Sequence, residues 1–181
     1  MKPEFVLYIA TSLDGYIART DGSIDWLPDV DPEAEDYGYN EFYGAIDALV
    51  MGATTYEQVL TFGEWVYPGK QSYVLTQRSL SSDRPDITFV DGVEATVDQI
   101  TQQGYQRIWV VGGGKVISAL MQQSLITEFI ITVFPLLLGS GIPLFQSVPE
   151  HSLKLIQAKP FASGAVELRY QLSPTGTTEK N

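Results

Sequence analysis

Two short turns, one made of glycine and the other of glycine, alanine and threonine, are the segments best suited to hold a charged ligand. Residues 112–114 are Gly-Gly-Gly and follow the apolar run 108–111, and residues 52–55 are Gly-Ala-Thr-Thr and follow the apolar run 48–51. Glycine lets a ligand approach the backbone closely, and free N–H groups at the start of a following helix attract phosphate. Neither turn has the spacing of a Walker A loop or of GxGxxG, so each alone also fits a simple strand-to-helix connection. Together, after two parallel strands, they can hold the two phosphates of a dinucleotide and favour a nucleotide cofactor.

The cysteine and histidine counts exclude several other chemistries. The chain has no cysteine and a single histidine, His151. Zinc sites built from Cys and His, thiol nucleophiles and disulfides cannot form, and we expect no metal site. A Ser-His-Asp triad would depend on His151, whose surroundings are typical of a loop.

The charge of the chain is strongly acidic. Lys and Arg number 11 and Asp and Glu number 22, which gives a net charge of −11. The scattered basic residues form no stripe that could follow a phosphate backbone, so we expect no nucleic-acid partner. No apolar run approaches the length of a membrane span, and no secretory signal is visible at the N-terminus. We therefore expect a soluble, cytoplasmic protein with no membrane partner.

The apolar pattern alternates between strands and helices, which predicts an α/β fold with a central mixed, mostly parallel sheet flanked by helices. Strands are expected at residues 5–10, 48–51, 72–76, 87–90, 108–111 and 128–138, and a C-terminal antiparallel hairpin at 153–161 and 165–172. Helices are expected at residues 33–46, 56–60 and 96–103, with Thr96 capping the third, and from the glycines at 112–114 to residue 122. We predict one domain over residues 1–172 and a flexible tail at 173–181.

Five motifs occur in an order that resembles a known family. They are residues 8–18 (YIATSLDGYIA), 47–57 (DALVMGATTYE), 74–78 (VLTQR), 109–115 (WVVGGGK) and 135–145 (PLLLGSGIPLF). The series is similar to the dihydrofolate-reductase-like family, most of all to the branch of the C-terminal reductase domain of bacterial riboflavin biosynthesis. The resemblance covers about residues 4–172.

This resemblance implies NADPH as cofactor and hydride transfer to a pteridine-, pyrimidine- or ribosylaminopyrimidine-like small molecule. By position, Ala10 borders the nicotinamide, and a mobile loop within residues 13–17 covers it. The two turns hold the pyrophosphate, residues 75–76 flank the adenosine, and residues 77–78 lie near the ribose. The implied cofactor-binding residues are Ala10, Leu13, Asp14, Gly15, Ile17, Gly52, Ala53, Thr54, Thr55, Leu75, Thr76, Arg78, Val111, Gly112, Gly113, Gly114, Lys115 and Val116. Leu13, Ile17 and Leu75 are also compatible with ordinary packing.

Two departures from the family pattern concern the cofactor phosphate and the proton. Dihydrofolate reductases often carry Arg or Lys where this chain has Ala53, which leaves Arg78 as the cation for the 2′-phosphate, or as an exposed arginine at a strand end. The position matching their substrate-facing carboxylate is Asp36, our candidate proton donor, although a solvated acid near a helix start fits as well. Tyr8, Tyr39, Phe42 and Trp65 are the candidate substrate contacts, with core packing as the alternative.

Alternatives remain open on activity, substrate and assembly. The chain lacks the Cys and His residues of the deaminase that often accompanies this reductase domain, so a stand-alone reductase is expected. Beyond Arg78 and Lys115, few cations are available for a substrate phosphate. A rival hypothesis is a dinucleotide- or pterin-binding protein without turnover. A homodimer is a further expectation, with residues 130–138 either pairing with a second copy or covered within the chain.

Overall fold

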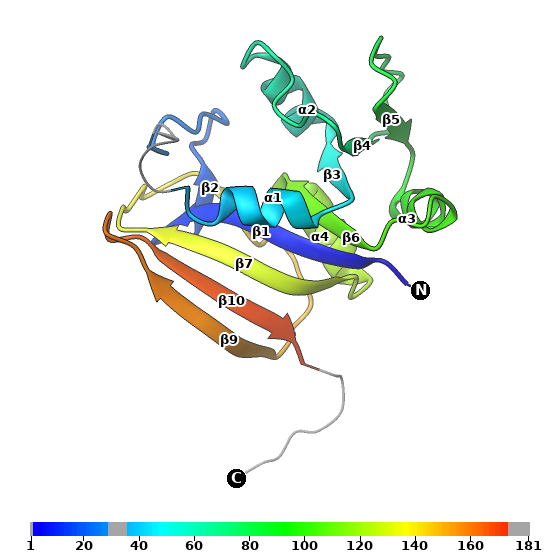
Figure 1. Cartoon of the computed structure of the whole chain (residues 1–181). Helices are drawn as coiled ribbons and strands as arrows, with labels where there is room; N and C mark the ends of the chain where they lie inside the picture. The colour runs from blue at the N-terminus through cyan, green and yellow to red at the C-terminus, as the bar shows by residue number, and fades with distance from the viewer. Residues whose placement is uncertain (1, 29–35, 174–181) are drawn as a thin grey trace.

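Eight strands form one mixed sheet in a computed structural model that describes residues 2–28 and 36–173 (Figure 1). The strand order is β5-β4-β3-β6-β1-β7-β10-β9. The strands are β1 (Glu4–Ser12), β3 (Ala48–Gly52), β4 (Gln71–Leu75), β5 (Ile87–Val90), β6 (Arg107–Gly112), β7 (Ile126–Phe134), β9 (Leu153–Pro160) and β10 (Val166–Leu172). All neighbours from β5 to β7 pair in parallel, whereas β10 is antiparallel to both β7 and β9. The predicted α/β class and C-terminal antiparallel hairpin are confirmed.

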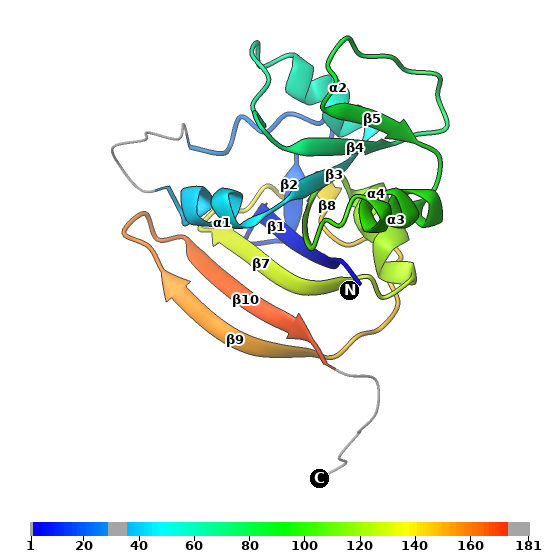
Figure 2. The ribbon, with the colours of Figure 1, turned by 45° about the vertical axis from the view of Figure 1, so that its right-hand side comes forward.

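Helices cover both faces of the sheet (Figure 2). The helices α1 (Tyr39–Ala45) and α2 (Ala53–Leu60) pack on one face, while α3 (Val93–Gln102) and α4 (Gly114–Gln122) pack on the other. Central strands such as β3 are buried along their length, because both of their faces are covered. A short ribbon of β2 (Tyr16–Ala18) and β8 (Ile142–Pro143) follows the carboxyl end of β1.

Two predicted helix starts are wrong for local reasons. The helix expected at 33–46 begins at Tyr39, because Tyr37 and Gly38 adopt left-handed φ values of 51° and 79° that no α-helix can include. Its expected start at residues 33–35 lies outside the described residues. The third helix begins at Val93, so Thr96 is not its cap; it is buried in the first turn and its hydroxyl donates to the Gly92 carbonyl.

The other two differences are smaller. The helix expected at 56–60 begins directly after the Gly52 turn, at Ala53. The strand expected at 128–138 spans Ile126–Phe134 and ends before Pro135, which has no backbone N–H to continue the ladder. The tail expected at 173–181 lies outside the described residues except for Ser173.

The strand β7 is covered within the chain. It pairs with β1 on one side and β10 on the other, which leaves no edge for a second copy. The homodimer stays a prediction, and any pairing through this end of the sheet would use the exposed edge strand β9. Within residues 2–28 and 36–173, no helix has the length and hydrophobicity needed to cross a bilayer.

Candidate functional site

The two glycine-bearing turns meet at one edge of the sheet. The strands β3 and β6 are parallel neighbours, with Met51 paired to Gly112, so their carboxyl ends lie side by side. A Cβ atom at Gly113 would lie 3.4 Å from Thr55 Oγ1, and one at Gly52 would lie 3.1 Å from Val116 Cγ2. The turns are therefore in contact, as the sequence predicted from their separate motifs.

Both turns lead directly into helices. The helix α2 begins at Ala53 and α4 begins at Gly114, so the unpaired N–H groups of both helix starts are at this same edge. Gly112 has a φ of +124°, which L side chains rarely adopt, and the peptide bond that joins it to Gly113 is cis. Lys115 is exposed in the first turn of α4 and forms no ion pair within the described part of the chain. This edge can accept an anionic ligand through backbone groups and one free ammonium.

The next strand brings Arg78 to the same edge. Leu75 of β4 pairs with Gly52, and the Thr76 hydroxyl accepts a hydrogen bond from the Arg78 backbone N–H. The Arg78 guanidinium forms a two-bonded ion pair with Glu57 of α2, with a distance of 3.1 Å between Arg78 Nη1 and Glu57 Oε2. Both side chains are about half exposed. The predicted phosphate-binding cation therefore already has a carboxylate partner.

The loop after β1 is tied to a distant segment. The Asp14 carboxylate accepts hydrogen bonds from the Leu138 N–H at 3.1 Å and the Gly139 N–H at 2.7 Å, and from the Ser12 hydroxyl at 2.6 Å. The Ser12 bond and these backbone bonds lower the pKa of Asp14. Ile17, in β2, packs against the core, whereas Leu13 is 64% exposed. Of the predicted loop residues, Leu13 is thus the apolar side chain available to a ligand.

A second group of candidate residues lies on the sheet face under α1. Tyr8 and Ala10 project from β1 on this face, and the Tyr8 ring stacks on Phe42 of α1 with centroids 4.3 Å apart. Tyr39 lies 6.3 Å from Tyr8, between centroids. The structure brings Tyr8, Tyr39 and Phe42 together, as predicted, and does not bring Trp65 to them. Trp65 packs against Tyr56 and Tyr67, and its indole N–H donates to the Tyr67 carbonyl.

Asp36 is engaged by backbone groups just before α1. Its carboxylate accepts the Gly38 N–H at 2.9 Å and the Asn40 N–H at 3.2 Å. These backbone hydrogen bonds lower the pKa of Asp36 below its usual value, so the side chain is ionised at neutral pH. The geometry suits a residue that stabilises the start of the helix.

Residues that the sequence did not single out complete this face. Thr132 of β7 pairs with Ala10, and Glu167 of β10 pairs with Thr132, so the three residues form one row across the sheet. Thr132 is 5% exposed and Glu167 is 2% exposed. The sequence contained a signal for Glu167. The alternation along the strand expected at 165–172 places Glu167 and Arg169 on one face, and two charged residues are unusual on the face of a strand that pairs with an apolar one.

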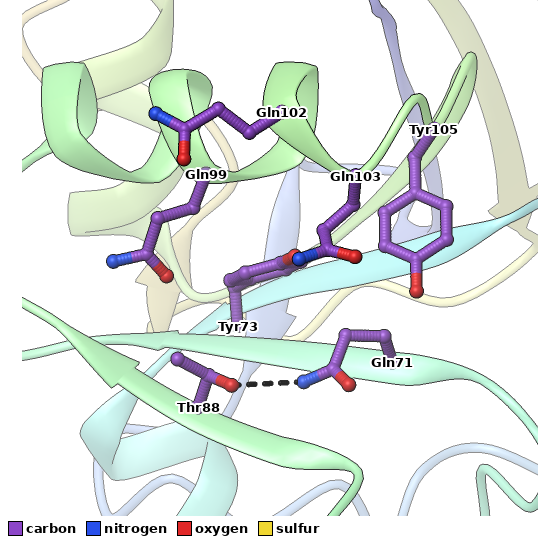
Figure 3. A pocket seen from close by; sticks show the side chains of 7 residues that line it. All are labelled: Gln71, Tyr73, Thr88, Gln99, Gln102, Gln103 and Tyr105. Atoms are coloured by element: carbon purple, nitrogen blue, oxygen red, sulfur yellow. Dashed lines mark hydrogen bonds between the residues drawn. The ribbon is translucent and has the colours of Figure 1, made fainter.

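A separate pocket of about 290 Å³ lies between α3 and the strands β4 and β5 (Figure 3). Its lining is neutral and polar, and it consists of Gln71, Tyr73, Thr88, Gln99, Gln102, Gln103 and Tyr105. Gln71 begins β4, and Tyr105 precedes β6, so the pocket is near the amino ends of the strands. It shares no residue with either candidate region and offers no carboxylate or ammonium for acid-base chemistry.

The arginines of the chain are all paired with carboxylates. Arg19 binds Asp25, Arg84 binds Asp86, and Arg107 binds Glu128, in addition to the Arg78–Glu57 and Arg169–Glu167 pairs. Within residues 2–28 and 36–173, no guanidinium is left unpaired for a substrate phosphate.

Comparisons with known proteins agree with this geometry. The model of the RibD C-terminal domain family matches residues 3–166. The chain is 42% identical over 173 residues to the uncharacterized protein YwjB of Bacillus subtilis (strain 168), covering 94% of this chain and 98% of YwjB.

Solved structures share the fold. A candidate riboflavin biosynthesis protein from Shewanella sp. PV-4 is 31% identical, with a TM-score of 0.85, covering 94% of this chain and 99% of that one. The dihydrofolate reductase of Enterococcus faecalis, solved with NADP(H), is 15% identical, with a TM-score of 0.70, covering 96% of this chain and 99% of that one. The chain therefore belongs to the RibD C-terminal domain family, a family of NADPH-dependent reductases with the dihydrofolate-reductase-like fold.

Proposed function

We propose that this protein is an NADPH-dependent reductase that transfers a hydride to a C=N or C=O bond of a small nitrogen heterocycle. The observation that carries the proposal is the contact between the two glycine-bearing turns, where Gly113 faces Thr55 and the helices α2 and α4 both begin. Two helix starts at one sheet edge suit a pyrophosphate, whose two negative charges they can share.

The residues present fit a dinucleotide. Gly52 and Gly113 let the two turns pack closely, because a Cβ atom would lie 3.1 Å from Val116 Cγ2 at the first and 3.4 Å from Thr55 Oγ1 at the second, and Lys115 adds an exposed ammonium. The adenosine would lie beyond Gly52, near Leu75 and Thr76, with Arg78 beside its ribose. When bound, NADPH supplies the hydride, and the protein orients the partners and excludes water.

The ring to be reduced would lie on the face of the sheet beside Ala10. The half-buried ring of Tyr8, which stacks on the buried Phe42, provides an aromatic wall at one side, and Thr132 lies in the row of Ala10. Every arginine in the described residues has a carboxylate partner, so a phosphate on the substrate would be met by a lysine such as Lys159, which pairs with Glu167 across β9 and β10. Protonation of Asp36, which a proton donor needs, would weaken the backbone hydrogen bonds that its ionised carboxylate accepts.

A second candidate function is a dinucleotide- or pterin-binding protein without turnover. The backbone hydrogen bonds that lower the pKa of Asp36 favour it, because they make the carboxyl group a poorer proton donor. A water molecule from solvent could supply the proton in place of Asp36, and an ionised Asp36 would then not prevent catalysis.

Deuterium transfer distinguishes the two functions. The protein is incubated with NADPH labelled at the nicotinamide C4 position and with a panel of oxidised pteridines and pyrimidines, and the products are analysed by mass spectrometry. If the protein is a reductase, one ring product gains one deuterium atom for each NADPH that is oxidised. Saturable NADPH binding with no label in any ring, at enzyme concentrations that allow single turnovers, would instead support the binding protein.

A further inference from the structure

One pocket lies outside both regions of the candidate site. It is the space of about 290 Å³ between α3 and the strands β4 and β5, near the amino ends of the strands. The two glycine-bearing turns follow the carboxyl ends of β3 and β6, so the pocket is at the other end of the sheet from the proposed cofactor. Its volume is far larger than one water molecule needs. The pocket therefore has room for a ligand of its own.

Three strand residues form the floor of this pocket. Gln71 and Tyr73 alternate along β4 and therefore point to the same face, and Thr88 of β5 pairs with Tyr73. The Gln71 side-chain amide donates to the Thr88 hydroxyl at 3.0 Å, which holds both side chains in place (Figure 3). Tyr73 is 3% exposed, so the pocket is deepest at its hydroxyl.

The end of α3 forms the wall of the pocket. Gln99, Gln102 and Gln103 are spaced by three and four residues, so they share one face at the end of the helix. Gly104 then adopts a left-handed φ of +76°, which ends the helix and turns the chain so that Tyr105 also lines the pocket. Figure 3 shows the Gln99 and Gln103 amides and the Tyr105 hydroxyl pointing from this wall toward β4.

The polar groups of the pocket are neutral, and most have no partner. The hydroxyls of Tyr73 and Tyr105 and the side-chain amides of Gln99 and Gln103 make no hydrogen bond within the described part of the chain. Burial, with a smaller contribution from Tyr105, raises the pKa of Tyr73, so its phenol stays protonated. A charged ligand would lose hydration here without an opposite charge to replace it. The pocket therefore suits an uncharged ligand with several groups that both donate and accept hydrogen bonds.

We propose that this pocket binds a neutral polyhydroxylated molecule, either a monosaccharide or a linear polyol. Each hydroxyl of such a ligand can donate and accept, which matches the glutamine amides and the tyrosine hydroxyls. The rings of Tyr73 and Tyr105 provide apolar surface for its C–H groups. A planar base would stack best between parallel walls, whereas Figure 3 shows the Tyr73 ring nearly edge-on and the Tyr105 ring face-on. The inference goes beyond the proposed function and does not depend on it.

Titration of the ¹⁵N-labelled full chain tests this assignment through the pocket's own amides. D-Glucose and the linear D-sorbitol are added separately, and the side-chain amide signals of Gln71, Gln99 and Gln103 are followed by NMR. We expect at least one of the two compounds to shift these signals saturably, with a Kd in the millimolar range. The compound with the lower Kd shows whether the ligand is cyclic or linear. The signal of Gln157, exposed on β9, is the internal control and should not move.

Two variants assign the binding to residues of the pocket. Tyr73→Phe keeps the ring and removes a hydroxyl that has no partner in the described residues, so the variant should fold and raise the Kd by about threefold to tenfold. Gln99→Ala changes a half-buried side chain on the other wall and should have a similar effect, which keeps the test open if Tyr73→Phe does not fold. The matched control Gln157→Ala should leave the Kd unchanged.

Three results would overturn the assignment. Shifts that stay linear with concentration, or that affect Gln157 equally, would show only non-specific contact. Saturable shifts with uracil and with neither polyhydroxylated compound would replace the assignment with a site for a planar base. An unchanged Kd in both Tyr73→Phe and Gln99→Ala would place the ligand elsewhere on the protein.

Discussion

The two regions of the candidate site are built in different ways. The cofactor edge consists of two runs of consecutive residues, 52–55 and 112–116, which meet because β3 and β6 are neighbours. The substrate face is assembled from single side chains in separate segments, among them Tyr8, Thr132 and Glu167. The first region offers mainly backbone N–H groups, and the second offers aromatic, hydroxyl and carboxylate groups.

This difference implies separate constraints on the two regions. Backbone recognition depends on turn conformation, so most changes in the turns should damage binding of any dinucleotide. Side-chain recognition depends on a few atoms, so a single substitution on the substrate face can change the accepted ring while cofactor binding is kept. The predictions below test whether the two regions can be altered independently.

The largest effect is expected at Gly112. An alanine there must adopt a φ of +124°, which costs about 1–3 kcal/mol of folding free energy. Because the same conformation shapes the turn, Gly112→Ala should also raise the Kd of NADPH by more than about tenfold. Urea unfolding and NADPH titration measure the two effects.

The matched control is Gly104→Ala, at the end of α3 and near the amino ends of the strands. Gly104 has a φ of +76° and no atoms that a Cβ would meet within 4 Å. The Gly104→Ala variant should be less stable than the wild type and should keep its affinity for NADPH. Equal NADPH affinity in both variants would show that the turn at 112–114 is not part of the cofactor site.

An intermediate effect is expected at the Arg78–Glu57 pair. Arg78→Gln should raise the Kd of NADPH by about tenfold and leave the Kd of NADH unchanged, because only NADPH carries the 2′-phosphate. Glu57→Gln should lower the Kd of NADPH, since it frees the Arg78 guanidinium and removes a carboxylate that repels the phosphate. The ratio of the two dissociation constants measures both changes, with the exposed Glu64→Gln as the control. An unchanged ratio in all three variants would remove Arg78 from the cofactor site.

The smallest effect is expected at Asp36. Asp36→Ala should lower stability by about 1 kcal/mol at neutral pH, since two backbone N–H groups lose their acceptor. The folded-state pKa lies below its ordinary value of 3.8, so the ionised carboxylate stabilises the protein above that pH and the contribution is lost as pH falls through the folded-state pKa. The stability difference between wild type and variant should therefore shrink in acid below about pH 4.

Turnover decides whether Asp36 has a second role. In Asp36→Asn, which keeps one acceptor oxygen, we expect turnover to change by less than tenfold, as in the exposed control Asp98→Asn. A fall of about 100-fold or more with an unchanged KM would identify Asp36 as the proton donor after all.

The cofactor edge was predictable from the sequence because its information is local. Glycine after an apolar run predicted both turns, and the strand expected at 72–76 is β4, which ends at Leu75 and is followed directly by Thr76. The partner of Arg78 was not predictable, because Glu57 and Arg78 come from different elements that meet only in the fold.

The substrate face was predictable only in part. The candidate substrate contacts Tyr8, Tyr39 and Phe42 lie together, with Tyr8 stacked on Phe42, and their contact with a substrate stays a prediction. Glu167 was missed because its neighbours across the sheet, Thr132 and Ala10, lie far away in sequence and the register between strands is not encoded locally. The start of α1 was misplaced because nothing in the residue type of Tyr37 shows its left-handed conformation.

Thermal unfolding with saturating NADPH, and separately with NADH, tests the central claim most directly. At about a hundred times Kd, binding adds about 2.7 kcal/mol, which for a chain of this size raises Tm by about 5–10 °C. We predict that shift with NADPH for the wild type and a much smaller one for Gly112→Ala at the same concentration. No shift with either nucleotide would contradict the reductase assignment and leave the two turns as structural connections.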